Sequence, residues 1–141
     1  MSPSITRTIR RWLPAVAWMA LIFWFSSQPD LPRPPSDLLN LILRKGAHFG
    51  VYAVLALTYV HALGGWQHRR LAFVLAVLYA ISDEFHQSFT PNRFPSAMDV
   101  LIDSAGALAG LWLGPYGQRF VAERGRSAAR DRGRAGAERR V

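Results

Sequence analysis

Four long apolar runs, separated by short polar segments, constrain the fold of this chain more than any other feature. The runs cover residues 12–25, 46–63, 71–82 and 97–114. With its flanks, each run reaches the length of about 20 residues that a helix needs to cross a membrane. A soluble four-helix bundle would need a polar outer face on every helix, and the first run, with AVAWMALIFWF, offers none. We therefore predict an all-α, polytopic membrane protein, a bundle of four transmembrane helices.

Basic residues set the expected orientation, because cytoplasmic loops carry an excess of Lys and Arg. Arginines gather in the N-terminal arm (residues 1–11), in the loop with Arg69 and Arg70, and in the tail (residues 117–141). With four spans these three segments lie on the same side of the membrane. We therefore predict that both termini are cytoplasmic, and that residues 12–116 form a multi-pass domain in the inner, cytoplasmic membrane.

Most of the positive charge lies in the tail. Residues 117–141 hold eight arginines and three acids, whereas residues 1–116 hold nine basic residues and six acids. A nucleic-acid-binding domain would instead spread its charge over a folded face, so we expect no nucleic-acid partner. The tail is polar and rich in Gly, which predicts a disordered segment or one bound to anionic lipid. The chain has no cysteine, which excludes disulfides and thiolate chemistry.

The densest polar cluster, DEFHQSFTPNRFPSAMD at residues 83–99, lies between the last two apolar runs. At about 100° per residue, Asp83, Glu84 and Gln87 share one helix face. Two further stripes at helical spacing are Lys45, His48, Tyr52 and Tyr59, and Asp99, Asp103, Gly106 and Gly110. In the four-span topology all three stripes meet at the outer membrane boundary, where charged groups must pair or face water. We therefore predict one shared polar pocket there, with Asp103 as its deepest acid and with the two glycines at a close helix contact.

Two segments, KGAHFGVYAVLAL and SDEFHQSFTPNRFPSAMDVLIDSAGALAG, resemble the VanZ-like family of small membrane proteins. The signature of that family is Lys-x-x-His-x-x-x-Tyr, then Glu-x-x-Gln, a Pro-x-Arg loop, and an Asp that leads into a Gly-x-x-x-Gly helix. The matching residues are Lys45, His48, Tyr52, Glu84, Gln87, Pro91, Arg93, Asp99, Gly106 and Gly110. The resemblance covers residues 20–114, and Asp103 stands where the family often has Asn. It implies a cell-envelope protein and, from the founding member, antibiotic resistance to teicoplanin, but it implies no reaction and no cofactor.

One functional hypothesis is a site that binds or modifies an envelope lipid or a lipid-linked cell-wall precursor and thereby affects susceptibility to lipoglycopeptides such as teicoplanin. Lys45 and Arg93 would hold a phosphate or carboxylate. The candidate catalytic residues are Glu84, Asp99 and His48, as a carboxylate base with a histidine partner. The other candidate substrate-binding residues are Tyr52, Gln87 and Asp103. The sequence leaves open whether the site is enzymatic.

The alternative hypothesis is a non-enzymatic structural or scaffolding protein. The ion pairs Lys45–Asp99 and Arg93–Glu84 would then lock the bundle, because removing one partner of a buried pair is strongly destabilising. A third idea places a hard cation among Asp83, His86, Asp99 and Asp103. Their spacing is not diagnostic, so we predict no metal site. The sequence does not determine the oligomeric state.

Overall fold

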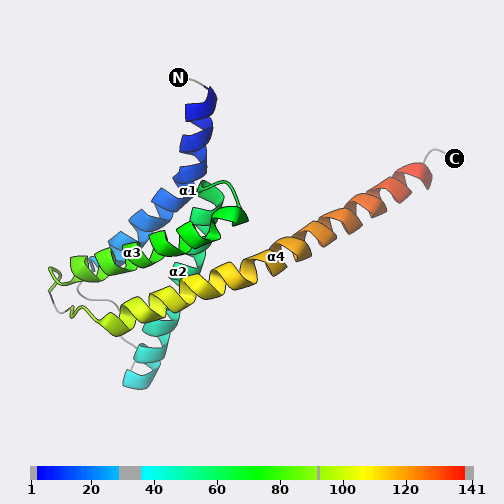
Figure 1. Cartoon of the computed structure of the whole chain (residues 1–141). Coiled ribbons are helices and arrows are strands. Elements are labelled where there is room, and N and C mark those ends of the chain that lie inside the picture. The colour runs from blue at the N-terminus through cyan, green and yellow to red at the C-terminus, as the bar shows by residue number, and fades with distance from the viewer. Residues whose placement is uncertain (1–2, 29–35, 92, 139–141) are drawn as a thin grey trace. The chain divides into compact units, whose positions relative to one another are not determined.

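The computed structural model describes residues 3–28, 36–91 and 93–138, and within these ranges the side chains other than those of residues 3, 4, 37, 40 and 118–138. The regular elements of the described residues are all helices, which confirms the all-α prediction. Its elements are α1 (Pro3–Ser26), α2 (Asp37–Ala62), the short 3-10 helix η1 (Trp66–His68), α3 (Arg69–Gln87) and α4 (Ala97–Glu138) (Figure 1). Met1–Leu111 form one compact unit and Trp112–Val141 a second. The core and the candidate site lie in the first unit.

Helix α2 begins and ends at residues that suit those positions. The Ser36 hydroxyl accepts a hydrogen bond from the Leu39 N–H at 3.4 Å, which is the N-cap arrangement expected there. From Asp37 the chain forms one continuous helix as far as Ala62, because no proline interrupts the segment. The helix ends at Ala62, and the chain then turns toward η1 at Gly64 and Gly65, whose φ angles of 92° and 136° strongly favour glycine.

The core lies where α2 packs between α1 and α3. Helix α3 buries three alanines at a spacing of one helical turn, Ala72, Ala76 and Ala80, so α3 can approach its neighbours closely. Two buried polar groups join the helices: the Trp18 indole donates to the Val51 carbonyl at 2.9 Å, and the Tyr79 hydroxyl donates to the Met19 carbonyl at 2.7 Å. These bonds satisfy aromatic donors that would otherwise be buried without partners.

The first turns of α4 lie directly against α2. A Cβ atom added to Gly106 would stand 2.1 Å from the Phe49 carbonyl oxygen, and one added to Gly110 would stand 2.5 Å from the Ala53 carbonyl oxygen. No larger side chain fits at either position, so the two glycines let the helix backbones touch. The close contact predicted from the Gly-x-x-x-Gly spacing is therefore confirmed.

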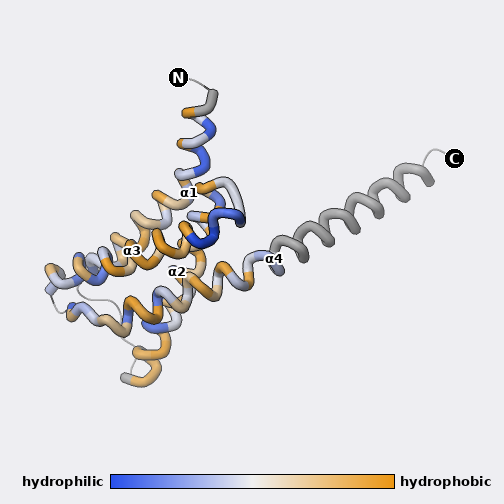
Figure 2. The backbone as a smooth tube through the Cα atoms, viewed as in Figure 1, coloured by the Kyte–Doolittle hydropathy of each residue, from blue (hydrophilic) through white to orange (hydrophobic). Residues whose placement is uncertain are grey.

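Two of the described helices are long and apolar enough to cross a membrane, over Leu41–Ala62 and Ala97–Gly117. The described parts of α1 and α3 do not reach that threshold, because arginines occupy the start of both helices and acids occupy the end of α3. In Figure 2 the hydrophobic colour covers most of the length of the helices in the first unit, the beginning of α2 included, and the hydrophilic colour gathers at the beginning of α1 and near η1. These features indicate a membrane protein.

The structure describes the backbone of the tail as far as residue 138. Helix α4 continues through it as far as Glu138. The physical reason is composition, because Ala, Arg and Glu all have high helix propensity, and here they outweigh the scattered glycines.

Candidate functional site

The buried face of α3 changes from apolar to polar along its length. The stripe that begins with the three alanines continues one turn later with Asp83, Glu84 and Gln87, each only 4% exposed. Helical periodicity therefore carries three polar side chains into the interior of the bundle. Within this group the Gln87 amide donates to Asp83 Oδ2 at 3.1 Å.

Glu84 joins the end of α3 to the beginning of α4. Its Oε2 atom accepts a hydrogen bond from the backbone N–H of Ser96 at 2.7 Å, and Ser96 is the residue before the first turn of α4. A carboxylate is stabilised at this position by the unpaired N–H groups and the positive end of the helix dipole. Glu84 therefore fixes the connection that carries Arg93.

Two charged pairs join α2 to α4. Lys45 Nζ pairs with Asp99 Oδ1, as the scaffolding hypothesis predicts. One turn further along both helices, His48 Nδ1 lies 3.1 Å from Asp103 Oδ1. Asp103 is fully buried and is thus the deepest acid, as predicted. The bond to Asp103 fixes the His48 ring, and the structure gives the other ring nitrogen, Nε2, no partner among the described residues.

Arg93 lies over the C-terminal end of α1. Its Nε and Nη2 atoms donate to the Gln28 carbonyl at 3.3 and 3.1 Å, and Nη2 also approaches the Phe25 carbonyl at 3.5 Å. A guanidinium suits this place, because the last carbonyls of a helix lack intrahelical partners. The predicted Arg93–Glu84 ion pair is wrong: the described residues form no such pair, since Oε2 of Glu84 accepts from the Ser96 N–H and the Arg93 guanidinium donates to the Gln28 and Phe25 carbonyls.

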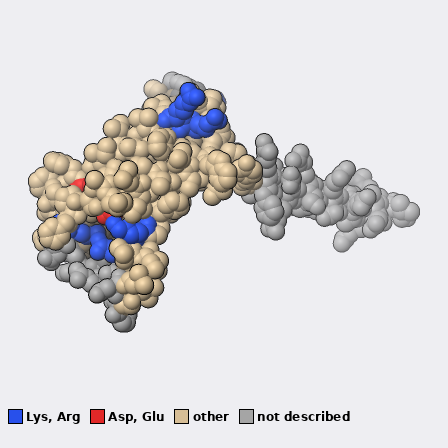
Figure 3. All heavy atoms as spheres, turned by 60° about the horizontal axis from the view of Figure 1, so that its bottom comes forward, with Lys and Arg blue, Asp and Glu red and all other residues tan. Residues whose placement is uncertain are grey.

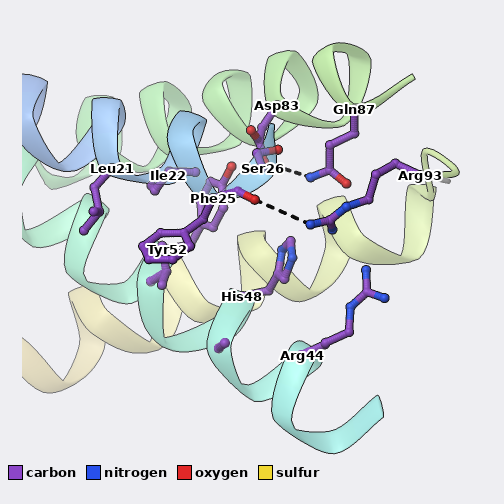
Figure 4. A pocket seen from close by; sticks show the side chains of 12 residues that line it. Leu21, Ile22, Phe25, Ser26, Arg44, His48, Tyr52, Asp83, Gln87 and Arg93 are labelled. Atoms are coloured by element: carbon purple, nitrogen blue, oxygen red, sulfur yellow. Dashed lines mark hydrogen bonds between the residues drawn. The ribbon is translucent and has the colours of Figure 1, made fainter. Parts of the chain in front are cut away.

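A pocket of about 300 Å³ opens between α1, α2 and α3 beside Arg93 (Figure 4). The polar residues that line it are Ser26, Arg44, His48, Tyr52, Asp83, Gln87 and Arg93, and the apolar ones are Leu21, Ile22, Phe25, Ala47 and Val51. Of the predicted site residues, the structure brings His48, Tyr52, Gln87 and Arg93 to this pocket. The lining does not include Lys45, Glu84, Asp99 and Asp103, which lie in the helix contacts described above.

Arg44 is a pocket residue that we do not predict from the sequence. It is exposed, and Figure 4 shows its guanidinium and that of Arg93 pointing toward the same space beside His48. Burial lowers the pKa of Arg93, and repulsion from Arg44 lowers it further. The available signal was the spacing of four residues between Arg44 and His48, which places both on one face of a helix. No comparable spacing in the sequence indicated that residues of α1 line the same pocket.

Several buried polar atoms in this region have no hydrogen-bond partner among the described residues. Three of them belong to pocket residues on three different helices: Ser26 Oγ, Tyr52 OH and Asp83 Oδ1. The other two are Glu84 Oε1 and Asp103 Oδ2. An unsatisfied buried polar group costs about 1–3 kcal/mol, so a ligand or water that reaches the pocket would gain by pairing with these atoms.

A cation held by three aspartates and His86 does not agree with the described geometry. The His86 ring stacks on Phe23 with ring centroids 4.3 Å apart, and its Nε2 atom lies 3.0 Å from the Ser27 hydroxyl, away from Asp99 and Asp103. Within the described ranges, no three His, Cys, Asp or Glu side chains gather closely enough to hold a metal ion.

A second, more basic hollow lies at the other end of α1. It is lined by Thr6, Arg7, Arg10, Arg11 and His61 and measures about 480 Å³. Arg11 is separated from Ser26 by 15 residues of continuous helix, which corresponds to about 22 Å. Figure 3 shows the basic side chains of the described surface in two separate groups, with acidic atoms beside one of them.

The sequence model of one protein family, VanZ/LLP1, matches residues 11–117 of the chain. The matched segment contains every residue of the pocket and of the charged pairs. No curated protein sequence and no solved structure shows significant similarity to this chain.

Proposed function

The chain belongs to the VanZ/LLP1 family, and from this premise we propose that it is a multi-pass protein of the inner membrane whose pocket binds or modifies an envelope lipid or a lipid-linked cell-wall precursor. In this proposal four helices cross the membrane. The pocket lies at the outer face, and both termini lie in the cytoplasm.

Exposed apolar side chains support four spans. Large hydrophobic residues are exposed not only on α2 and α4 but also on α1 and α3, where they include Leu13, Val16, Trp24, Val74, Leu78 and Ile81. A water-soluble protein rarely exposes so much contiguous apolar surface, whereas a lipid-facing helix requires it. The separation of the pocket from the hollow with Arg7, Arg10 and Arg11 supports the orientation, because basic segments favour the cytoplasmic side.

The observation that carries the proposal is the composition of the pocket. Its floor holds buried polar atoms that have no partner among the described residues, its mouth holds two guanidinium groups, and its wall holds the exposed apolar side chains of Leu21 and Phe25. Such a site suits an amphiphilic molecule whose polar headgroup leaves the bilayer and whose chains remain in it. A fully water-soluble ligand would gain little from the apolar wall.

The residues have distinct roles in this proposal. Arg93 contacts the anionic part of the headgroup, and Tyr52 and Gln87 contact the remainder. Modification of the ligand would use His48 as general acid or base, because Asp103 holds its ring and its Nε2 atom has no partner in the part of the chain that the structure describes. Glu84 and Asp99 act on the site through the helix contacts that position Arg93 and Lys45.

Blocking the pocket with a bulky side chain tests the proposal. Ala47 is exposed and lines the pocket, so Ala47→Trp fills the mouth with little effect on the core. Ala105→Trp is the matched control, because Ala105 is an exposed alanine of α4 outside the pocket. We expect lipid that copurifies with the protein to be lost only from Ala47→Trp, and lipoglycopeptide susceptibility to change with it at equal membrane abundance. Unchanged lipid in Ala47→Trp would refute the pocket as the binding site.

The helix contacts favour a second candidate function, that of a structural or scaffolding protein. Lys45–Asp99, Glu84–Ser96 and Arg93 at the end of α1 each tie two elements together. If scaffolding is the whole function, substitutions at these residues change cellular phenotype only as far as they lower protein abundance. A phenotype in Ala47→Trp at normal abundance would separate the two candidates in favour of ligand binding.

A further inference from the structure

We infer that the ligand of this pocket is a lipid with a phosphodiester and a neighbouring hydroxyl group, its phosphate between Arg44 and Arg93 and its hydroxyl directed at Asp83 and Tyr52. The inference rests on the proposed function, since it names the chemistry of the headgroup that the same pocket would bind.

The two arginines are the reason for inferring a phosphate in the ligand. Within the described chain, Arg44 has no ion pair or hydrogen bond, and Arg93 donates from Nε and Nη2 to the Gln28 carbonyl just after α1, whereas its Nη1 has no partner. Both guanidinium groups converge on one space (Figure 4), and like charges repel unless an anion lies between them. A phosphate offers several oxygen atoms and suits two arginines better than a single carboxylate does. Lys45, which we predict as a phosphate ligand, is already paired with Asp99, so Arg44 takes that place.

The buried polar atoms at the floor of the pocket are the reason for inferring a hydroxyl group in the ligand. Among the described residues, Asp83 Oδ1 and Tyr52 OH are buried without hydrogen-bond partners, and a carboxylate oxygen lacks a donor rather than an acceptor. A phosphodiester has no hydrogen to donate and its charge is repelled by a carboxylate, so the phosphate alone cannot satisfy Asp83. A hydroxyl group beside the phosphate donates to Asp83 and accepts from Tyr52. An ammonium group would also donate, but the two guanidinium groups disfavour a further cation in this space.

The source of the phosphate is a lipid, because the pocket opens onto an apolar surface. Leu21 and Phe25 line it and are 41% and 53% exposed. Val51 and Ile22 complete the apolar wall on α2 and α1. A chain that enters along this wall buries apolar area at about 25 cal/mol per Å², which a soluble phosphate ester cannot gain.

Binding of defined lipids to the purified full-length protein in detergent, measured by native mass spectrometry, tests this assignment. The probes are dioleoyl lipids with three headgroups: phosphatidylglycerol, which has a phosphodiester and hydroxyls, phosphatidylmethanol, which has the same charge without hydroxyls, and phosphatidylethanolamine, which has an ammonium group. We expect phosphatidylglycerol to bind tightest. Phosphatidylmethanol should bind several-fold more weakly for the lost hydrogen bonds, and phosphatidylethanolamine about tenfold more weakly. sn-Glycerol 3-phosphate at millimolar concentration should not compete.

Matched variants separate recognition from stability. Arg44→Gln should weaken phosphatidylglycerol binding about tenfold. Arg70→Gln should not change it, because Arg70 lies at the end of α3 that is remote from the pocket. Tyr52→Phe should remove the preference for phosphatidylglycerol over phosphatidylmethanol without lowering the thermal midpoint, because its hydroxyl has no partner among the described residues. Tyr79→Phe should show the reverse pattern, because its hydroxyl bonds to Met19.

The outcomes distinguish this inference from the proposed function. If Ala47→Trp blocks lipid binding but the three lipids bind equally, or Arg44→Gln behaves as Arg70→Gln does, the headgroup assignment is wrong and the lipid pocket stands. If glycerol phosphate competes, the ligand is not a lipid. If Ala47→Trp binds lipid as the unmodified protein does, the proposed function itself fails.

Discussion

The contact between α2 and α4 makes a sharp prediction about Gly106. In Gly106→Ala the new methyl group would lie 2.1 Å from the Phe49 carbonyl oxygen, whereas ordinary contacts begin at 3.4 Å, so the backbones must separate by about 1.3 Å. Overpacking of this kind typically costs about 1–3 kcal/mol. The same movement pulls Asp99 and Asp103 away from Lys45 and His48, which adds to the loss.

The measurement is the free energy of unfolding in detergent micelles, from a denaturant titration followed by circular dichroism. Gly50→Ala is the matched control, because a Cβ at Gly50 of α2 would meet no atom within 4 Å. Replacing an unconstrained helical glycine by alanine stabilises by about 0.5–1 kcal/mol. The two identical substitutions should therefore change stability in opposite directions. Equal stability of Gly106→Ala and the unmodified protein would refute the close packing of α4 on α2.

Two further predictions concern the pair at the site and the topology. Lys45→Ala and Asp99→Ala should each lower the free energy of unfolding of the protein. A double-mutant cycle should give a coupling energy of about 1–2 kcal/mol, less than for a fully buried pair, because the two side chains are 33% and 19% exposed. Additive effects of the two substitutions would show that the pair contributes nothing. Since the chain has no cysteine, a single cysteine can be introduced as Phe94→Cys or as Arg69→Cys and labelled in intact cells with a maleimide that does not cross the membrane. Only Phe94→Cys should react. Labelling of both variants or of neither would contradict the four-span topology.

Sequence periodicity was sufficient for much of the candidate site. The spacing of Lys45, His48 and Tyr52 places them on one face whatever α2 packs against, and the same holds for Asp99 and Asp103 on α4. Four long apolar runs likewise predict helices, because a helix satisfies its backbone groups within its own segment and needs about 20 apolar residues to cross lipid. The spacing of Gly106 and Gly110 alone also indicates a helix contact, because small residues one turn apart leave room for a neighbouring backbone.

Which side chains pair with each other across the helices, by contrast, was decided by the tertiary structure. Periodicity says which side chains share a face but not how far two helices slide along each other, and a shift of one turn changes every pair. The sequence allowed Arg93 to meet Glu84, yet the loop places Arg93 on the Gln28 carbonyl just after α1 and leaves Glu84 to the Ser96 N–H. It also allowed Lys45 to hold a ligand, yet the register of α2 on α4 assigns Lys45 to Asp99 and turns Arg44 toward the pocket.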